Sequence, residues 1–120
     1  ADGGTRTAAI TGAYVALHQA FAGLVKAGEL PRVPLAEPLA AISCGLVGGV
    51  AVLDLDYAED SGAEADANFV LTGSGGIVEI QVTAETAPLA ADQFVAMHRL
   101  AVAGVRKLVR LQRQVLGVEP

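Results

Sequence analysis

The chain contains 120 residues, of which 52% are hydrophobic, 18% charged and 4% aromatic. This length suits one domain with a substantial core, and the apolar content excludes a disordered chain. The net charge of −5 excludes a uniformly basic nucleic-acid binder, so any contact with phosphate backbones has to be local or use a surface lent by another segment. We expect one soluble, cytoplasmic domain over residues 1–120, with no apolar run long enough to span a membrane.

The first predicted element is an amphipathic helix from Thr5 to about Ala27. Its apolar side chains recur at helical spacing, and Gly28 supplies a stop signal. These side chains are Ile10, Tyr14, Leu17, Phe21, Leu24 and Val25. Three prolines between Leu30 and Pro38 forbid both a helix interior and a central strand, so a connecting loop is predicted there.

Two β-hairpins are predicted in the middle of the chain. The runs Ala40–Val47 and Val50–Tyr57 flank Gly48-Gly49, a pair that tolerates the positive φ angles of a tight hairpin turn. A second pair, Ala67–Thr72 and Ile77–Thr83, flanks the glycine-rich residues 73–76. The single cysteine, Cys44, lies in the first run, where a buried structural thiol is expected and no internal disulfide is possible.

The last predicted element is a long helix that Pro88 opens and that ends near Leu116. Strands grouped between two long helices indicate an α+β fold, with the helices covering one face of a mostly antiparallel sheet. One face of the last helix is basic, carrying Arg99, Arg106, Arg110 and Arg113. This face is either solvated or a local contact for RNA.

The first seven residues, Ala1–Thr7, combine Gly3 and Gly4 with Thr5 and Arg6 at the mouth of the predicted helix. Glycines let a backbone approach a ligand, the first N–H groups of a helix point outward, and a guanidinium offers a fork of charged donors. The motif therefore favours a phosphate site. An ordinary turn followed by a helix N-cap explains the same residues equally well.

An acidic segment, residues 54–66, contains six carboxylates. In one interpretation it is a solvated loop, as most charge runs are. In the other, Asp60 and Asp66 converge on one site, where they bind Mg²⁺ or position a proton. Carboxylates beside an anion site are compatible when a metal or a proton lies between them, and phosphoryl transfer provides such a centre.

Several separated motifs resemble those of bacterial ribonuclease PH in order and spacing. They are residues 1–8, 10–13 and 54–61, and residues 79–81 with 83–85. The resemblance covers essentially the whole chain, which corresponds to the C-terminal half of the family's usual length. It implies a ribonuclease PH-like (ribosomal protein S5 domain 2-like) fold that is incomplete at the N-terminus, where the family has further strands.

The resemblance also implies an activity: a phosphate-dependent 3′→5′ exoribonuclease, or tRNA nucleotidyltransferase, that trims tRNA precursors and other RNA 3′ ends and releases nucleoside diphosphates. The family's phosphate-binding motif maps onto Gly4, Thr5 and Arg6, with inorganic phosphate as co-substrate. Its paired aspartates map onto Asp60 and Asp66, associated with Mg²⁺ and with protonation of the leaving ribose oxygen.

Members of this family assemble as hexameric rings, so the resemblance implies homo-oligomers that act on RNA, with no DNA or membrane partner. The alternative of a different class is a catalytically silent ring subunit or an RNA-binding structural module with the same fold. Retention of Arg6, Asp60 and Asp66 favours the enzyme.

Overall fold

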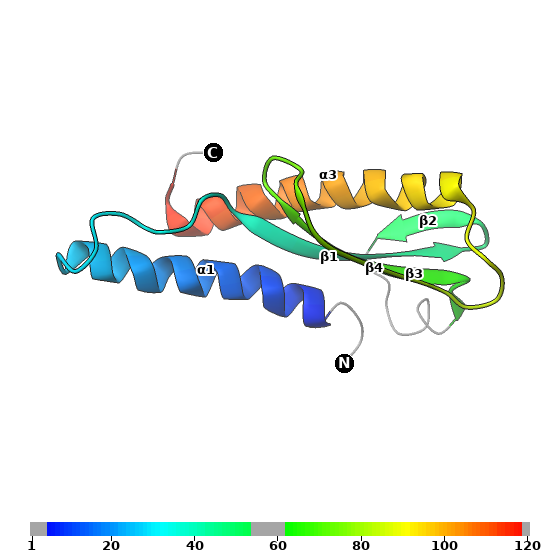
Figure 1. The fold of residues 1–120 in the computed structure, drawn as a ribbon, viewed down its shortest axis with the longest axis horizontal. Helices are drawn as coiled ribbons and strands as arrows, with labels where there is room; N and C mark the ends of the chain where they lie inside the picture. Colours follow the sequence, from blue (N-terminus) through cyan, green and yellow to red (C-terminus); the bar gives the residue numbers. More distant parts are fainter. Residues whose placement is uncertain (1–4, 54–61, 119–120) are drawn as a thin grey trace.

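The computed structural model describes residues 5–53 and 62–118 of the chain. Its elements follow the predicted order of helix, hairpin, hairpin and helix (Figure 1). They are α1 (Thr5–Lys26), β1 (Leu39–Val47), β2 (Val50–Leu53), β3 (Ala65–Thr72), β4 (Ile77–Ala84) and α3 (Ala91–Leu116). The α+β class predicted from the sequence is confirmed.

The four strands form one antiparallel sheet in the order β2-β1-β3-β4. The glycine turn between β1 and β2 is tight because Gly48 and Gly49 adopt φ angles of 58° and 77°, which side chains rarely tolerate. In the centre of the sheet Phe69 of β3 lies opposite Ile42 of β1 and Ile80 of β4. Both predicted hairpins are therefore present.

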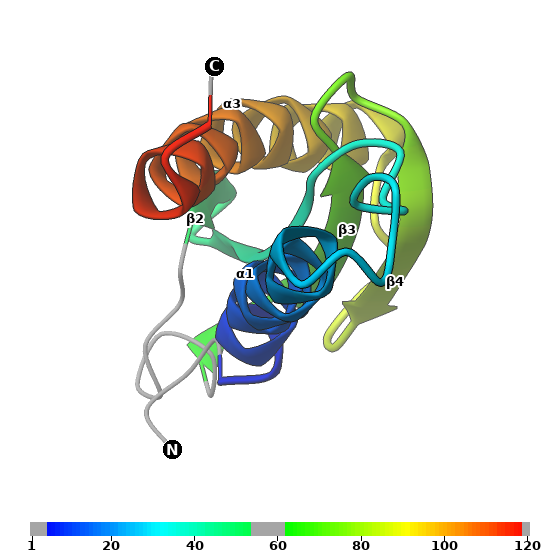
Figure 2. The same cartoon turned by 90° about the vertical axis from the view of Figure 1, so that its left-hand side faces the viewer.

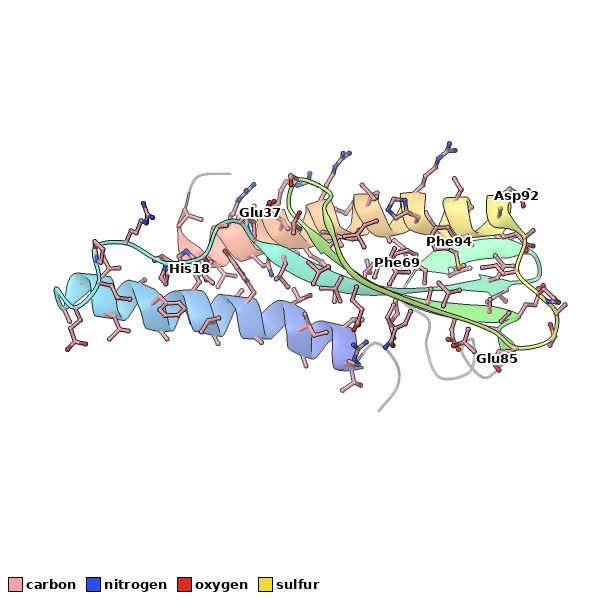
Figure 3. The ribbon with its side chains drawn as sticks, viewed as in Figure 1. His18, Glu37, Phe69, Glu85, Asp92 and Phe94 are labelled. Atoms are coloured by element: carbon pink, nitrogen blue, oxygen red, sulfur yellow. The ribbon has the colours of Figure 1, made fainter. Side chains whose placement is uncertain are left out.

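The hydrophobic core lies between α3 and one face of the sheet. It consists of Ala40, Ile42, Cys44 and Leu46 on β1, of Ala65, Ala67, Phe69 and Leu71 on β3, and of Met97, Ala101, Val105 and Val109 on α3. The Cys44 thiol is buried there, with Sγ 3.6 Å from the carbonyl oxygen of Met97, as expected of a structural thiol. Figure 3 shows Phe69 and Phe94 between the sheet and α3.

Helix α3 begins three residues later than predicted. Pro88 does not open it; the helix starts at Ala91, because the backbone N–H of Ala90 donates to Oε1 of Gln93 at 3.0 Å and so completes an N-terminal cap. The other end closes at Gly117, whose φ of 69° permits the turn that follows Leu116.

Helix α1 lies on the opposite face of the sheet from α3, so the expectation that both helices cover one face is wrong (Figure 2). The reason is a polar contact with β1. The backbone N–H of Ala41 donates to Oγ1 of Thr11 at 3.0 Å, and that hydroxyl donates to the carbonyl oxygen of Ala41 at 3.3 Å. The core-facing residues Ala40 and Ile42 point the other way, toward α3.

The two helices meet at the beginning of β1 through Gln112 of α3. Its side-chain nitrogen donates to the carbonyl oxygens of Thr11, at 3.1 Å, and Leu39, at 2.9 Å. Gln112 is only 3% exposed. A buried amide that satisfies carbonyls of two elements fixes α1, α3 and β1 relative to one another.

Most of α1 is nevertheless accessible in this chain. Thr7 is its one residue in the buried class, and Leu17 and Leu24 are 47% and 38% exposed. By length and composition, this helix of 22 residues could cross a membrane, since an 18-residue window within it has a mean hydropathy of 1.4. The expectation that no apolar run reaches such a length is therefore wrong, because alanine, glycine and threonine replace charged residues over most of the helix.

Candidate functional site

The sheet face that α1 covers is polar. Along β3 and β4, alternation turns Asp66 and Asn68 to this face together with Glu79, Gln81 and Thr83. Ser43 of β1 joins them, since its hydroxyl donates to Oδ1 of Asn68 at 2.8 Å. The other face carries the apolar core, so the candidate site has a rigid floor of three paired strands.

Helix α1 brings its N-terminus to the same part of this face. It runs antiparallel to β1 (Figure 1), and Thr11 is fixed at Ala41. Five residues of helix correspond to about 7.5 Å. That length equals roughly two residues of strand at about 3.3 Å each, which places Arg6 level with Ser43 and close to Gly45, the residue paired with Asp66.

Arg6 extends from α1 across the face of β3 to β4. Its Nη2 lies 2.6 Å from Oε1 of Glu79, a charge-assisted hydrogen bond between side chains that are 50% and 40% exposed. Helix α1 contacts β1, whereas Glu79 is two strands away, at about 4.8 Å per strand. The guanidinium therefore lies over the strand that carries Asp66.

The described part of the chain contains three of the five predicted site residues. Thr5 and Arg6 lie in the first turn of α1 and are exposed, and Asp66 is half-buried on β3 between Gly45 and Thr83. Gly4 and Asp60 lie outside the described residues. The prediction that Arg6 and Asp66 belong to one site agrees with their shared face, and the roles of all five residues remain predictions.

Two features of the site were not foreseen from the sequence. Thr7, which is 4% exposed, is buried beneath the first turn of α1, and Glu79 is the ionic partner of Arg6. The alternation of polar Glu79 and Gln81 with apolar Ile80 already indicated a strand with one solvent-exposed face. Nothing in that alternation specified which basic residue would reach it.

No group of three or more His, Cys, Asp or Glu side chains capable of holding a metal occurs within residues 5–53 and 62–118. The polar face carries two described carboxylates: Glu79, which is paired with Arg6, and Asp66, which offers a hard oxygen ligand. Mg²⁺ typically takes one or two protein carboxylates and completes its shell with water and substrate phosphates. The donor set therefore suits Mg²⁺ held jointly with a phosphorylated substrate.

The basic side chains of α3 lie away from this site. Arg99, Arg106 and Arg110 are exposed on α3, whose inner side packs on the opposite face of the sheet from Asp66. Within this chain the sheet separates them from Arg6 and Asp66. A single RNA strand bound at the polar face would not touch them in the same subunit.

Two hollows lined by described residues lie toward the other end of α1. One of about 300 Å³ is bordered mainly by apolar side chains, including Leu17 and Leu35, and another of about 180 Å³ is bordered by Tyr14, His18 and Arg113. Neither includes Arg6 or Asp66. Within the described residues, the candidate site is an exposed polar face beside the N-terminus of α1.

Comparisons with known proteins agree with this architecture. The family described as "3' exoribonuclease family, domain 2" matches residues 37–104. Proteins named Ribonuclease PH from Rhodospirillum rubrum and Methylobacterium sp. (strain 4-46) are 64% and 57% identical to the chain over 117 residues, or 98% of it. The chain spans 49% of the length of these curated relatives.

A solved structure of Rrp46 from rice (Oryza sativa) has the same fold. It superposes with a TM-score of 0.74 at 23% identity, and the match covers 97% of this chain and 49% of the rice protein. Together with the sequence matches, the four-stranded sheet between two helices leads to one assignment: the chain belongs to the 3′ exoribonuclease family and is similar to the C-terminal domain of ribonuclease PH.

Proposed function

We propose that this chain is the C-terminal half of a phosphorolytic 3′→5′ exoribonuclease that shortens RNA 3′ ends, those of tRNA precursors included, and releases nucleoside diphosphates. The observation that carries the proposal is the shared face of Arg6 and Asp66. A guanidinium and the first turn of a helix attract an anion, and a carboxylate on the same sheet face can handle a proton.

In the proposed reaction, Gly4, Thr5 and Arg6 hold inorganic phosphate through backbone N–H groups, a hydroxyl and a guanidinium. One phosphate oxygen forms a bond to the phosphorus that links the last two nucleotides. The bond from that phosphorus to the ribose O3′ of the penultimate nucleotide breaks, and this oxygen takes up a proton. The products are a nucleoside diphosphate and an RNA one nucleotide shorter.

Asp60 and Asp66 are proposed to deliver that proton to the departing O3′. Both would also hold Mg²⁺, which, when bound, offsets the negative charge that develops on the phosphate oxygens. General acid catalysis of this kind contributes about 10²–10⁴ to a rate. Because Asp66 stands on a strand paired on both sides, its backbone position is fixed before substrate binds.

The test is a tRNA precursor with extra 3′ nucleotides, incubated with the full-length protein with and without inorganic phosphate. We expect shortening only with phosphate and products that end in diphosphates. Products that form equally well without phosphate would contradict phosphorolysis. A protein without any turnover that still binds RNA would instead support the silent ring subunit.

We propose further that the protein acts in the cytoplasm as a homo-oligomeric ring of six subunits. Two observations support assembly. The chain carries a net charge of −5, so RNA has to be held by local basic residues or by a surface that another segment or subunit supplies, and apolar side chains such as Leu17 of α1 are exposed. Light scattering of the full-length protein is expected to give a mass near six subunits, and a stable monomer would contradict the ring.

A further inference from the structure

The ion pair between Arg6 and Glu79 has a geometry that the proposed reaction does not yet use. Arg6 is a long, half-exposed side chain at the end of a helix, where many rotamers are open to it. Its Nη2 donates to Oε1 of Glu79 on β4 at 2.6 Å. Without that partner, the guanidinium is free to turn into solvent, away from the sheet.

Glu79 holds the guanidinium at a defined position along β3, relative to Asp66. Glu79 lies opposite Val70, which is four residues from Asp66 along β3, or about 13 Å at 3.3 Å per residue. The pair therefore fixes the cation over the polar face while keeping it away from a direct ion pair with Asp66. A phosphate held by Arg6 would therefore lie over β3, on the same face as Asp66.

The chemistry of the guanidinium permits such an arrangement. Arginine has five N–H donors in a planar fork, and the contact with Glu79 uses Nη2. The remaining edge stays available for phosphate oxygens. A guanidinium whose rotamer is already fixed loses less conformational entropy when phosphate binds.

We propose that Glu79 is a positioning residue for phosphate binding: it orients the guanidinium of Arg6 over the face of β3. This inference rests on the proposed function, since it assigns phosphate to Arg6. It predicts that loss of Glu79 weakens the use of phosphate, whereas the chemical step, which depends on the aspartates, continues at nearly the normal rate.

The experiment compares Glu79→Ala, Glu79→Gln and the control Glu85→Gln in the full-length protein. Glu85 follows β4, is exposed, and lies at the end of the sheet, six residues from Glu79 along the chain (Figure 3). Measured quantities are KM for inorganic phosphate, kcat on a short RNA, and the phosphate-dependent rise in melting temperature, which requires no turnover. Circular dichroism establishes that each variant is folded.

We expect Glu79→Ala to raise KM for phosphate about two- to fivefold, the range typical of an exposed ion pair, with kcat within about twofold of wild type. Glu79→Gln keeps an oxygen acceptor and should recover part of the loss, while Glu85→Gln should leave KM unchanged. An unchanged or lower KM in Glu79→Ala overturns the proposal and shows that Glu79 is neutral or competes with phosphate.

Failure of the proposed function would look different from failure of this inference. If the wild-type protein neither shortens RNA with phosphate nor gains stability from it, the phosphate assignment of Arg6 is wrong. If the wild type does both and Glu79→Ala and Glu79→Gln behave like it, the phosphate assignment stands and the role of Glu79 is wrong.

Discussion

Replacement of Gly104 by alanine is expected to destabilise the protein, because side chains of the sheet pack directly against α3 at this residue. A Cβ atom at Gly104 would lie 2.2 Å from Cδ1 of Ile42 and 3.5 Å from Cδ1 of Leu53. The second separation is ordinary contact, but the first falls more than 1 Å short of the roughly 3.5–4.0 Å that carbon atoms prefer. Ile42 is 4% exposed, so its terminal methyl has little space into which to move.

Two opposing effects set the magnitude. Alanine favours the helix over glycine by about 1 kcal/mol. Overpacking of a well-filled core costs about 1–3 kcal/mol. We therefore expect Gly104→Ala to lower the free energy of unfolding by about 1 kcal/mol. Gly23 of α1 provides a matched control, since a Cβ there has nothing within 4 Å, and Gly23→Ala should stabilise by up to about 1 kcal/mol.

The assay is urea denaturation of wild type, Gly104→Ala, Gly23→Ala, Ile42→Val and the double variant of residues 42 and 104. Valine lacks the Cδ1 atom that clashes, so Gly104→Ala should become neutral or stabilising in the Ile42→Val background. If Gly104→Ala costs the same in both backgrounds, or stabilises the wild type as Gly23→Ala does, the proposed contact between Gly104 and Ile42 is refuted.

Three further predictions concern the site and the loops. Asp66→Asn should lower kcat for phosphorolysis at least about 100-fold with an unchanged circular dichroism spectrum, and near-normal turnover would remove Asp66 from the mechanism. Arg6→Ala should raise KM for phosphate about tenfold or more, because a charged hydrogen-bond donor is lost, and phosphate titrations of the rate would show it. Hydrogen bonds from the side chain and backbone of Ser74 hold the pKa of Glu37 below its ordinary value, with the Ser74 N–H 2.9 Å from Oε1. The stability that Glu37 adds is therefore complete above the ordinary carboxyl pKa near 4.3 and is lost as the pH falls through the lower pKa of the folded state. In a plot of the unfolding midpoint against pH, Glu37→Gln should reduce the slope on the acid side. An unchanged plot would contradict this assignment.

Local patterns in the sequence predicted most of the fold. Both hairpins followed from glycine pairs between β-rich runs, and the antiparallel sheet followed from the hairpins. The placement of α1 did not, because it depends on contacts between residues far apart in the chain, among them the hydroxyl of Thr11 and the amide of Gln112. Thr11 is an ordinary residue of an amphipathic helix in the sequence, and its bond to Ala41 appears only when the helix and the strand are packed together.

The candidate site was predictable in part. Glycines before Thr5 and Arg6 at a helix start indicated an anion site from local chemistry alone. The pairing with Asp66, sixty positions later, came from a family resemblance and is consistent with the shared sheet face. Glu79 was not foreseen as the partner of Arg6. Periodicity along a strand shows which face of the sheet a residue occupies, but it does not determine which residue of another element contacts it.

The hydroxyl of Thr11 also affects how this sheet associates with others. A strand residue whose N–H and C=O groups both lack partners is a template for an incoming strand. At Ala41 one threonine side chain occupies both groups, so that position of the sheet is closed to strand addition. Strand β4 forms the opposite border of the sheet and exposes Ile77 and Val78. Thr11 thus closes the part of β1 that β2 does not cover, while β2 and β4 remain the outer strands, and Thr11→Val would leave both backbone groups of Ala41 without this partner.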